Sequence, residues 1–153
     1  MSRVALHFPG WAKAVLYSNV LMSLATGSAW FALHRWVEIE GEFGPEKSPL
    51  EPWLMRVHGA SAFLILIGFG YLLASHIHVG WRAKRNRFSG LGLVGNVLAL
   101  ICTGYLLYYA SGESFRDGLS WTHLALGLSL PVTIALHVWR GHRTRRVTVG
   151  PGH

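Results

Sequence analysis

The chain has almost no cysteine and few charged residues, and both shortages narrow what it can be. Cys102 is its single cysteine, which excludes an intrachain disulfide, a zinc site built from several cysteines and the Cys-x-x-Cys-His motif that attaches haem covalently. Charged residues make up only 14% of the 153 positions, whereas 51% are hydrophobic and seven are tryptophan. This balance is typical of a membrane protein.

Acidic residues are scarce as well: the chain has seven Asp and Glu and fourteen Lys and Arg, which gives a formal net charge of +7. Such an excess can indicate nucleic-acid binding. Here, however, the basic residues lie in short clusters between apolar runs, so membrane topology explains them better and we expect no nucleic-acid partner.

Four long apolar segments, at about 11–36, 53–79, 91–110 and 119–139, dominate the sequence. Each has about 20 residues or more, which is enough for a helix to cross the hydrocarbon core. We recognise no repeat with sequence identity and no linker, and the longest connection, 37–52, is too short for a catalytic domain. The sequence therefore predicts one all-α domain over 1–153, an up-down bundle of four transmembrane helices.

The connections between the segments predict their orientation. Basic residues precede the first segment, join the second to the third and follow the fourth: Arg3 and Lys13; Arg82, Lys84, Arg85 and Arg87; Arg140, Arg143, Arg145 and Arg146. The other loops are acidic or mixed: Glu38, Glu40, Glu42, Glu46, Lys47 and Glu51; Glu113, Arg116 and Asp117. The positive-inside rule then places both termini in the cytoplasm and the acidic loops outside, as for a multi-pass protein of the bacterial inner membrane.

Histidines are the polar residues that this pattern does not explain. His58 and His76 are eighteen residues apart on the second segment, or five whole helical turns, so they share a face, while His78 points elsewhere. His123 and His137 are fourteen apart on the fourth segment and also share a face. Because the two segments run in the same direction, His58 and His123 form an outer pair, and His76 and His137 an inner pair.

Paired imidazoles in a bundle core are typical axial ligands of haem iron, one above and one below the ring. Zinc is a weaker interpretation, since a closed zinc site needs four ligands. A third interpretation is that each histidine only hydrogen-bonds across helices. His34, at the outer end of the first segment, is a rival outer ligand, whereas His7, His142 and His153 are expected to be solvated.

Small and basic residues near the pairs fit a haem site. Glycines leave room for a flat macrocycle or for close helix packing: Gly59, Gly68 and Gly70, and Gly127 with Ser129. Four arginines are candidates to contact haem propionates or only to set topology: Arg56 and Arg116 near the outer pair, Arg82 and Arg140 near the inner pair.

With this pattern in view, residues 53–146 resemble the small four-helix di-haem cytochromes b, which include the membrane subunits of hydrogenases and formate dehydrogenases and relatives found with multihaem c-type cytochromes. The similarity rests on RVHGAS from Arg56, HIHVGWRAKRNR from His76, TGYLLYY from Thr103 and the segment His123 to His137. The resemblance implies two non-covalent haems b, an outer one ligated by His58 and His123 and an inner one by His76 and His137. The first helix departs from the hydrogenase pattern, because Lys13 precedes 26-TG-27 where a histidine is usual.

The expected function is electron transfer across the inner membrane between the quinone pool and a periplasmic redox partner, such as a c-type cytochrome or a dehydrogenase subunit, within a hetero-oligomer. No catalytic residue is predicted, because the sequence lacks a compact acid–base cluster. Two alternatives stay open: a self-sufficient quinol or metal-ion reductase, and a non-redox membrane anchor. The acidic outer loop is a candidate to steer a basic partner.

Overall fold

The computed structural model describes residues 9–82 and 86–147, and this part of the chain is mostly helical. The long helices are α1 (Gly10–Trp36), α2 (Glu51–Leu72), α4 (Arg87–Tyr109) and α5 (Glu113–Val147), which confirms the four predicted helical segments. A π-helical turn, η1 (Leu73–Ile77), and the short α3 (His78–Arg82) follow α2 directly. The chain divides into two compact units, Met1–His76 and Ile77–His153, and each is described by itself.

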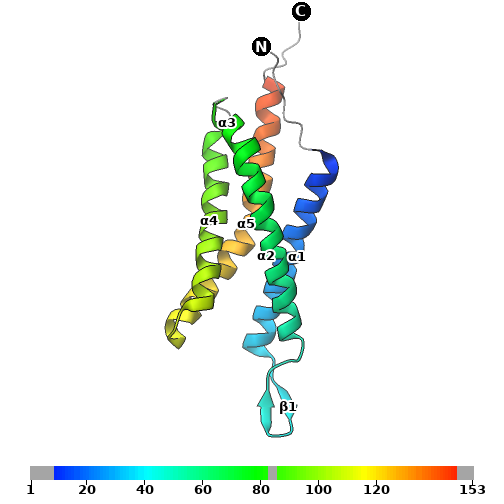
Figure 1. Cartoon of the computed structure of the whole chain (residues 1–153), viewed down its shortest axis with the longest axis vertical. Coiled ribbons are helices and arrows are strands. Elements are labelled where there is room, and N and C mark those ends of the chain that lie inside the picture. The colour runs from blue at the N-terminus through cyan, green and yellow to red at the C-terminus, as the bar shows by residue number, and fades with distance from the viewer. Residues whose placement is uncertain (1–8, 83–85, 148–153) are drawn as a thin grey trace, which may run out of the picture. The chain divides into compact units, whose positions relative to one another are not determined.

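The first unit is a helical hairpin in which α1 and α2 pack side by side (Figure 1). Helix α1 starts directly after Pro9, and its last turn carries Arg35, whose positive charge favours a helix C-terminus. Helix α2 begins with Glu51, a residue type that favours a helix N-terminus, followed by Pro52, whose fixed φ suits the first turn.

The connection between α1 and α2 contains a small β-hairpin that the sequence analysis did not predict. Strands β1 (Ile39–Gly41) and β2 (Gly44–Glu46) pair antiparallel, with Ile39 opposite Glu46 and Gly41 opposite Gly44. Gly44 has φ of 121°, a conformation that glycine tolerates best, and it closes the turn in which Phe43 is 92% exposed. The hairpin therefore projects an acidic, exposed tip beyond the ends of α1 and α2, which it connects (Figure 1).

The second unit is also a helical hairpin, formed by α4 and α5. Helix α4 follows Asn86, whose φ of 48° is left-handed, and α5 follows Gly112 with φ of 97°. The Arg116 guanidinium donates to the carbonyls of Leu107 and Ala110, which are among those left open at the end of α4. Our prediction of a loop through Glu113 and Asp117 is therefore wrong, since these residues belong to the first two turns of α5.

Three helical stretches are long and apolar enough to cross a membrane: Glu51–Ile77, Arg87–Tyr109 and Glu113–Arg143. Helix α1 has 27 residues but is not among them. It carries Lys13, Asn19 and Ser23 within its apolar sequence. Large apolar side chains such as Phe63 (71% exposed) and Ile67 (68%) face outward from α2, as expected where lipid or another helix covers a surface.

The predicted orientation is testable by cysteine labelling, because Cys102 can be replaced by serine to give a cysteine-free chain. We expect Phe43→Cys, at the tip of the β-hairpin, to react with a membrane-impermeant maleimide in intact cells. His142→Cys, exposed near the end of α5, is expected to react only after the cells are permeabilised, because the basic clusters stay inside. The reverse labelling pattern would contradict the orientation.

Candidate functional site

His58 lies on α2 and turns its ring toward α1. Its Nδ1 is 2.9 Å from the backbone carbonyl oxygen of Ser23. A carbonyl oxygen only accepts, so Nδ1 carries the proton and donates it. The ring fits against Gly27, where an added Cβ would stand 2.8 Å from His58 Cε1. Helix α1 thus supplies both an acceptor for the ring and the space that the ring occupies.

His123 lies on α5 and meets α4 in the same way. Its Nδ1 is 2.8 Å from the Thr103 hydroxyl oxygen. That hydroxyl donates its own proton back along α4, to the carbonyl of Ala99 at 2.8 Å, with that of Leu100 at 3.2 Å. It therefore accepts from His123, whose Nδ1 is again the protonated nitrogen. A Cβ added to the next residue, Gly104, would lie 3.3 Å from His123 Cε1.

His137 repeats the arrangement at the other end of the α4–α5 hairpin. Its Nδ1 is 3.1 Å from the Ser89 hydroxyl oxygen, and that hydroxyl donates to the carbonyl of Asn86 at 3.2 Å. A Cβ added to Gly90 would lie 3.5 Å from His137 Cε1. The Ser89-Gly90 and Thr103-Gly104 pairs are fourteen residues apart on α4, which matches the spacing of His123 and His137 on α5.

These three histidines share one orientation, because each turns Nδ1 toward an oxygen of the neighbouring helix. In the tautomer that donates from Nδ1 to this acceptor, the lone pair of the ring is on Nε2. Histidines that bind metals are oriented in this manner, with one nitrogen donating to a carbonyl or similar acceptor while the other coordinates. The assignment follows from what each acceptor does with its own proton.

His76 is different, because it lies in the π-helical turn η1 and is exposed. The Ser75 hydroxyl donates to the Tyr71 carbonyl at 2.7 Å, a local bond of the kind that bends helices. A π-turn advances the chain by less rotation per residue than an α-helix. The prediction that His76 shares a helix face with His58, and that His78 does not, assumed a regular α-helix through all three residues. The regular α-helix ends at Leu72, before His76. Single π-turns are frequent at functional sites.

The predicted pairs each combine one histidine from the first unit with one from the second. His58 and His76 belong to the first unit, and His123 and His137 to the second. The pairing of His58 with His123, and of His76 with His137, stays a prediction.

The four candidate arginines occupy varied environments. Arg56 lies over the Trp53 ring, with 4.8 Å from its guanidinium carbon to the ring centroid. Arg116 caps α4, as described above. Arg140 is exposed on α5, and the side chain of Arg82, at the end of α3, lies outside the described part of the structure. Their role toward propionates stays a prediction.

The glycines that receive the histidine rings are not those singled out from the sequence. A Cβ at Gly59, Gly70 or Gly127 would meet nothing within 4 Å, and one at Gly68 would make only ordinary contact with Leu16. Ser129 instead accepts a hydrogen bond from the Asn96 side-chain amide at 2.9 Å, a polar contact between α4 and α5. The ring-receiving glycines, Gly27, Gly90 and Gly104, lie on the helices without the candidate ligands and were missed.

A sequence signal for two of these glycines was available. The stretches 19-NVLMSLATG-27 and 96-NVLALICTG-104 are identical at five of nine positions, so the statement that no repeat exists is wrong. The repeated residues make equivalent contacts: the Thr26 hydroxyl bonds the carbonyls of Met22 and Ser23, as that of Thr103 bonds those of Ala99 and Leu100. Asn19 donates to the Ser61 carbonyl of α2 at 2.9 Å, as Asn96 donates to Ser129 of α5.

Within residues 9–82 and 86–147, no three His, Cys, Asp or Glu side chains gather closely enough to hold a metal ion by themselves. A haem needs fewer protein ligands, because the porphyrin supplies four of the iron ligands and histidine side chains supply only the axial ones. No protein-family model matches the sequence, and comparisons with curated proteins and with solved structures give no significant match. The resemblance to di-haem cytochromes b therefore stays a prediction.

Gly27→Ala tests the close approach of α1 to His58. Alanine normally stabilises a helix interior relative to glycine by about 0.5–1 kcal/mol. At Gly27 the added Cβ displaces the His58 ring, so we expect a net loss of about 1–3 kcal/mol in the free energy of unfolding. Thermal unfolding in detergent measures the change. Gly95→Ala is the matched control, because its Cβ meets nothing within 4 Å, and its unfolding temperature should not fall.

Proposed function

We propose that this chain is a di-haem b-type cytochrome subunit of the bacterial inner membrane that carries electrons between the quinone pool and a periplasmic redox partner. The observation that carries the proposal is that His58, His123 and His137 each turn Nδ1 toward an oxygen of the neighbouring helix. This orientation is the one that an axial ligand needs, because the nitrogen that coordinates must keep its lone pair while the other donates to an acceptor.

In this proposal His58 and His123 hold an outer haem b, and His76 and His137 hold an inner one. When bound, the haems supply one-electron transfer between ferric and ferrous iron. The chain's own contribution is to orient the rings: the Ser23 carbonyl and the hydroxyls of Thr103 and Ser89 fix them, and the adjacent glycines let the helices close around them. A hydrogen-bonded Nδ1–H also raises the basicity of the ligand and so favours the ferric state.

Two further features support a membrane electron carrier. The three apolar helices provide a dry, low-dielectric setting across a bilayer. At the end that we expect to face outward, the β-hairpin carries Glu40, Glu42 and Glu46, all exposed. An exposed acidic tip favours encounter with a basic partner such as a c-type cytochrome, because complementary charge accelerates association.

Alanine substitution of the four ligands tests the proposal directly. Purified wild-type protein is expected to contain two haems b per chain with a low-spin bis-histidine spectrum. His58→Ala and His123→Ala should each lose the same haem, and His76→Ala and His137→Ala the other, because one lost axial ligand releases the group. Haem content and redox titration of each variant measure this. A wild-type protein without haem would favour the membrane-anchor alternative, and a variant set that lost haems in other combinations would contradict the pairing.

Thr103→Val tests the hydroxyl that accepts from His123. Valine keeps the shape of threonine but removes the acceptor, so the ligand becomes less basic. We expect the midpoint potential of one haem to rise and its affinity to fall about tenfold or more. Thr122→Val is the matched control, because Thr122 neighbours His123 but its hydroxyl bonds the Gly118 carbonyl of its own helix. Equal potentials for the two variants would show that the Thr103 contact does not tune the site.

A further inference from the structure

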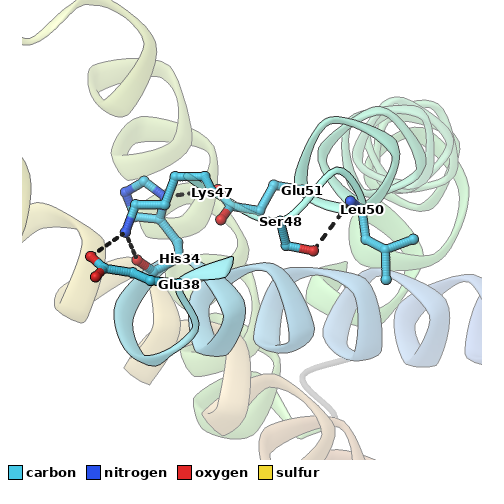
Figure 2. Close-up of polar contacts among 6 residues, drawn as sticks. All are labelled: His34, Glu38, Lys47, Ser48, Leu50 and Glu51. Carbon is cyan, nitrogen blue, oxygen red and sulfur yellow. Dashed lines mark hydrogen bonds and ion pairs between the residues drawn. The ribbon is translucent and has the colours of Figure 1, made fainter. Parts of the chain in front are cut away.

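Acidic and basic side chains are paired with one another at the connection between α1 and α2. His34 Nδ1 is 2.8 Å from Glu51 Oε2, and the Lys47 ammonium lies 3.8 Å from a carboxylate oxygen of Glu38 (Figure 2). The same ammonium donates to the His34 backbone carbonyl at 2.9 Å. The basic groups at this end of the first unit therefore have carboxylates of the chain itself beside them.

The last turns of α5 are basic in a different setting, because no acidic residue lies near them in the sequence. Residues 118–153 contain no Asp or Glu, and Arg140 and Arg143 are both exposed on α5. The acidic residues of the second unit, Glu113 and Asp117, belong to the first two turns of α5, and Asp117 is about 35 Å from Arg140 along the helix. Arginines three residues apart are neighbours on a helix surface, where like charges repel. An anion bound beside both side chains offsets this repulsion.

Trp139 positions the Arg143 side chain at the end of the apolar part of α5. The guanidinium carbon of Arg143 lies 4.0 Å from the centroid of the Trp139 ring, which is a cation–π contact. The stretch of α5 that is apolar enough to cross a membrane, Glu113–Arg143, ends at this residue. Tryptophan and the charged ends of long basic side chains both favour the boundary between hydrocarbon and water. The Arg143 guanidinium is therefore at the level that we expect for lipid headgroups.

An exposed apolar stripe leads along α5 to these arginines. Leu128, Val132 and Leu136 are 51%, 58% and 49% exposed, and Trp139 follows them at 49%. Their successive spacings of four, four and three residues keep the four side chains on one side of the helix, and Arg143 comes four residues later on the same side. From Leu128 to Trp139 the stripe is about 16 Å long, which is about half the thickness of the hydrocarbon core. The stripe therefore matches an acyl chain in one leaflet of a bilayer.

We propose that this side of α5 binds one anionic phospholipid, with the phosphate against Arg140 and Arg143 and an acyl chain along Leu128, Val132 and Leu136. Guanidinium groups bind phosphate well, because their planar N–H donors match its oxygens. A phospholipid fits both parts of the surface, since it joins a phosphate to an apolar chain of one leaflet's length. Arginines that only set topology need no apolar stripe leading to them on one side of a helix. The inference concerns the lipid alone and does not depend on haem.

Native mass spectrometry of the full chain, delipidated in detergent and titrated with lipid, tests the inference. The probes are phosphatidylglycerol and phosphatidylcholine with identical acyl chains. We expect the wild-type protein to bind one phosphatidylglycerol about tenfold or more tightly than phosphatidylcholine. Arg143→Gln and Arg140→Gln should each weaken phosphatidylglycerol binding about fivefold and leave phosphatidylcholine binding unchanged, because only the anionic headgroup depends on the charge. Val132→Asn should weaken binding of both lipids alike, because it makes the stripe polar.

Lys13→Gln is the matched control, because it removes one positive charge from an exposed position on α1 and should keep the wild-type affinity for phosphatidylglycerol. The inference is wrong if the wild-type protein binds the two lipids equally well. It is also wrong if Lys13→Gln weakens phosphatidylglycerol binding as much as Arg143→Gln does, because the preference would then reflect diffuse positive charge. Displacement of phosphatidylglycerol by an equal concentration of glycerol 3-phosphate would likewise overturn it, since the surface would then bind a free phosphate group and not a lipid.

Discussion

The hydrogen bond from a histidine Nδ1 to an acceptor on the neighbouring helix is the interaction on which the rest of this structure depends. In an apolar surrounding an unsatisfied imidazole is costly, so each histidine holds its helix to the one that supplies the acceptor. Ser23 does this for His58, and Thr103 and Ser89 do it for His123 and His137. The same bond selects the tautomer. The same contacts require space for the rings, and Gly27, Gly104 and Gly90 provide it on the helices that carry the acceptors.

The helices and the candidate ligands could be predicted from the sequence, but the acceptors could not. Apolar run length located the long helices within a few residues, except that α5 begins six residues before the predicted segment 119–139 and ends eight residues after it. Histidines stand out because they are rare in apolar segments. Their acceptors are ordinary serines, threonines and a backbone carbonyl, whose role depends on the register between antiparallel helices. Only the repeat of Asn-Val-Leu and Thr-Gly carried that register in the sequence.

At the π-turn Leu73–Ile77, helical periodicity no longer predicts which residues share a face of the helix. Counting turns assumes a constant rotation per residue, and a local side-chain bond such as that of Ser75 to the Tyr71 carbonyl competes with the regular backbone pattern. Neither glycine nor proline marks the change, so composition gives little warning. The Glu51–His34 pair was missed for a similar reason, since its partners are separated by an irregular connection with a β-hairpin whose path sets which side chains meet.

The two hairpins differ at one level of the repeat. In α4 a Ser-Gly pair precedes the Thr-Gly pair by fourteen residues and receives His137. Fourteen residues before Thr26-Gly27, α1 has Ala12 and Lys13 instead. Alanine has no hydroxyl to accept from an imidazole, and lysine has no space to receive a ring. The first unit thus has one Thr-Gly pair whose glycine faces a histidine ring, and the second unit has two such glycines, in a Thr-Gly and a Ser-Gly pair.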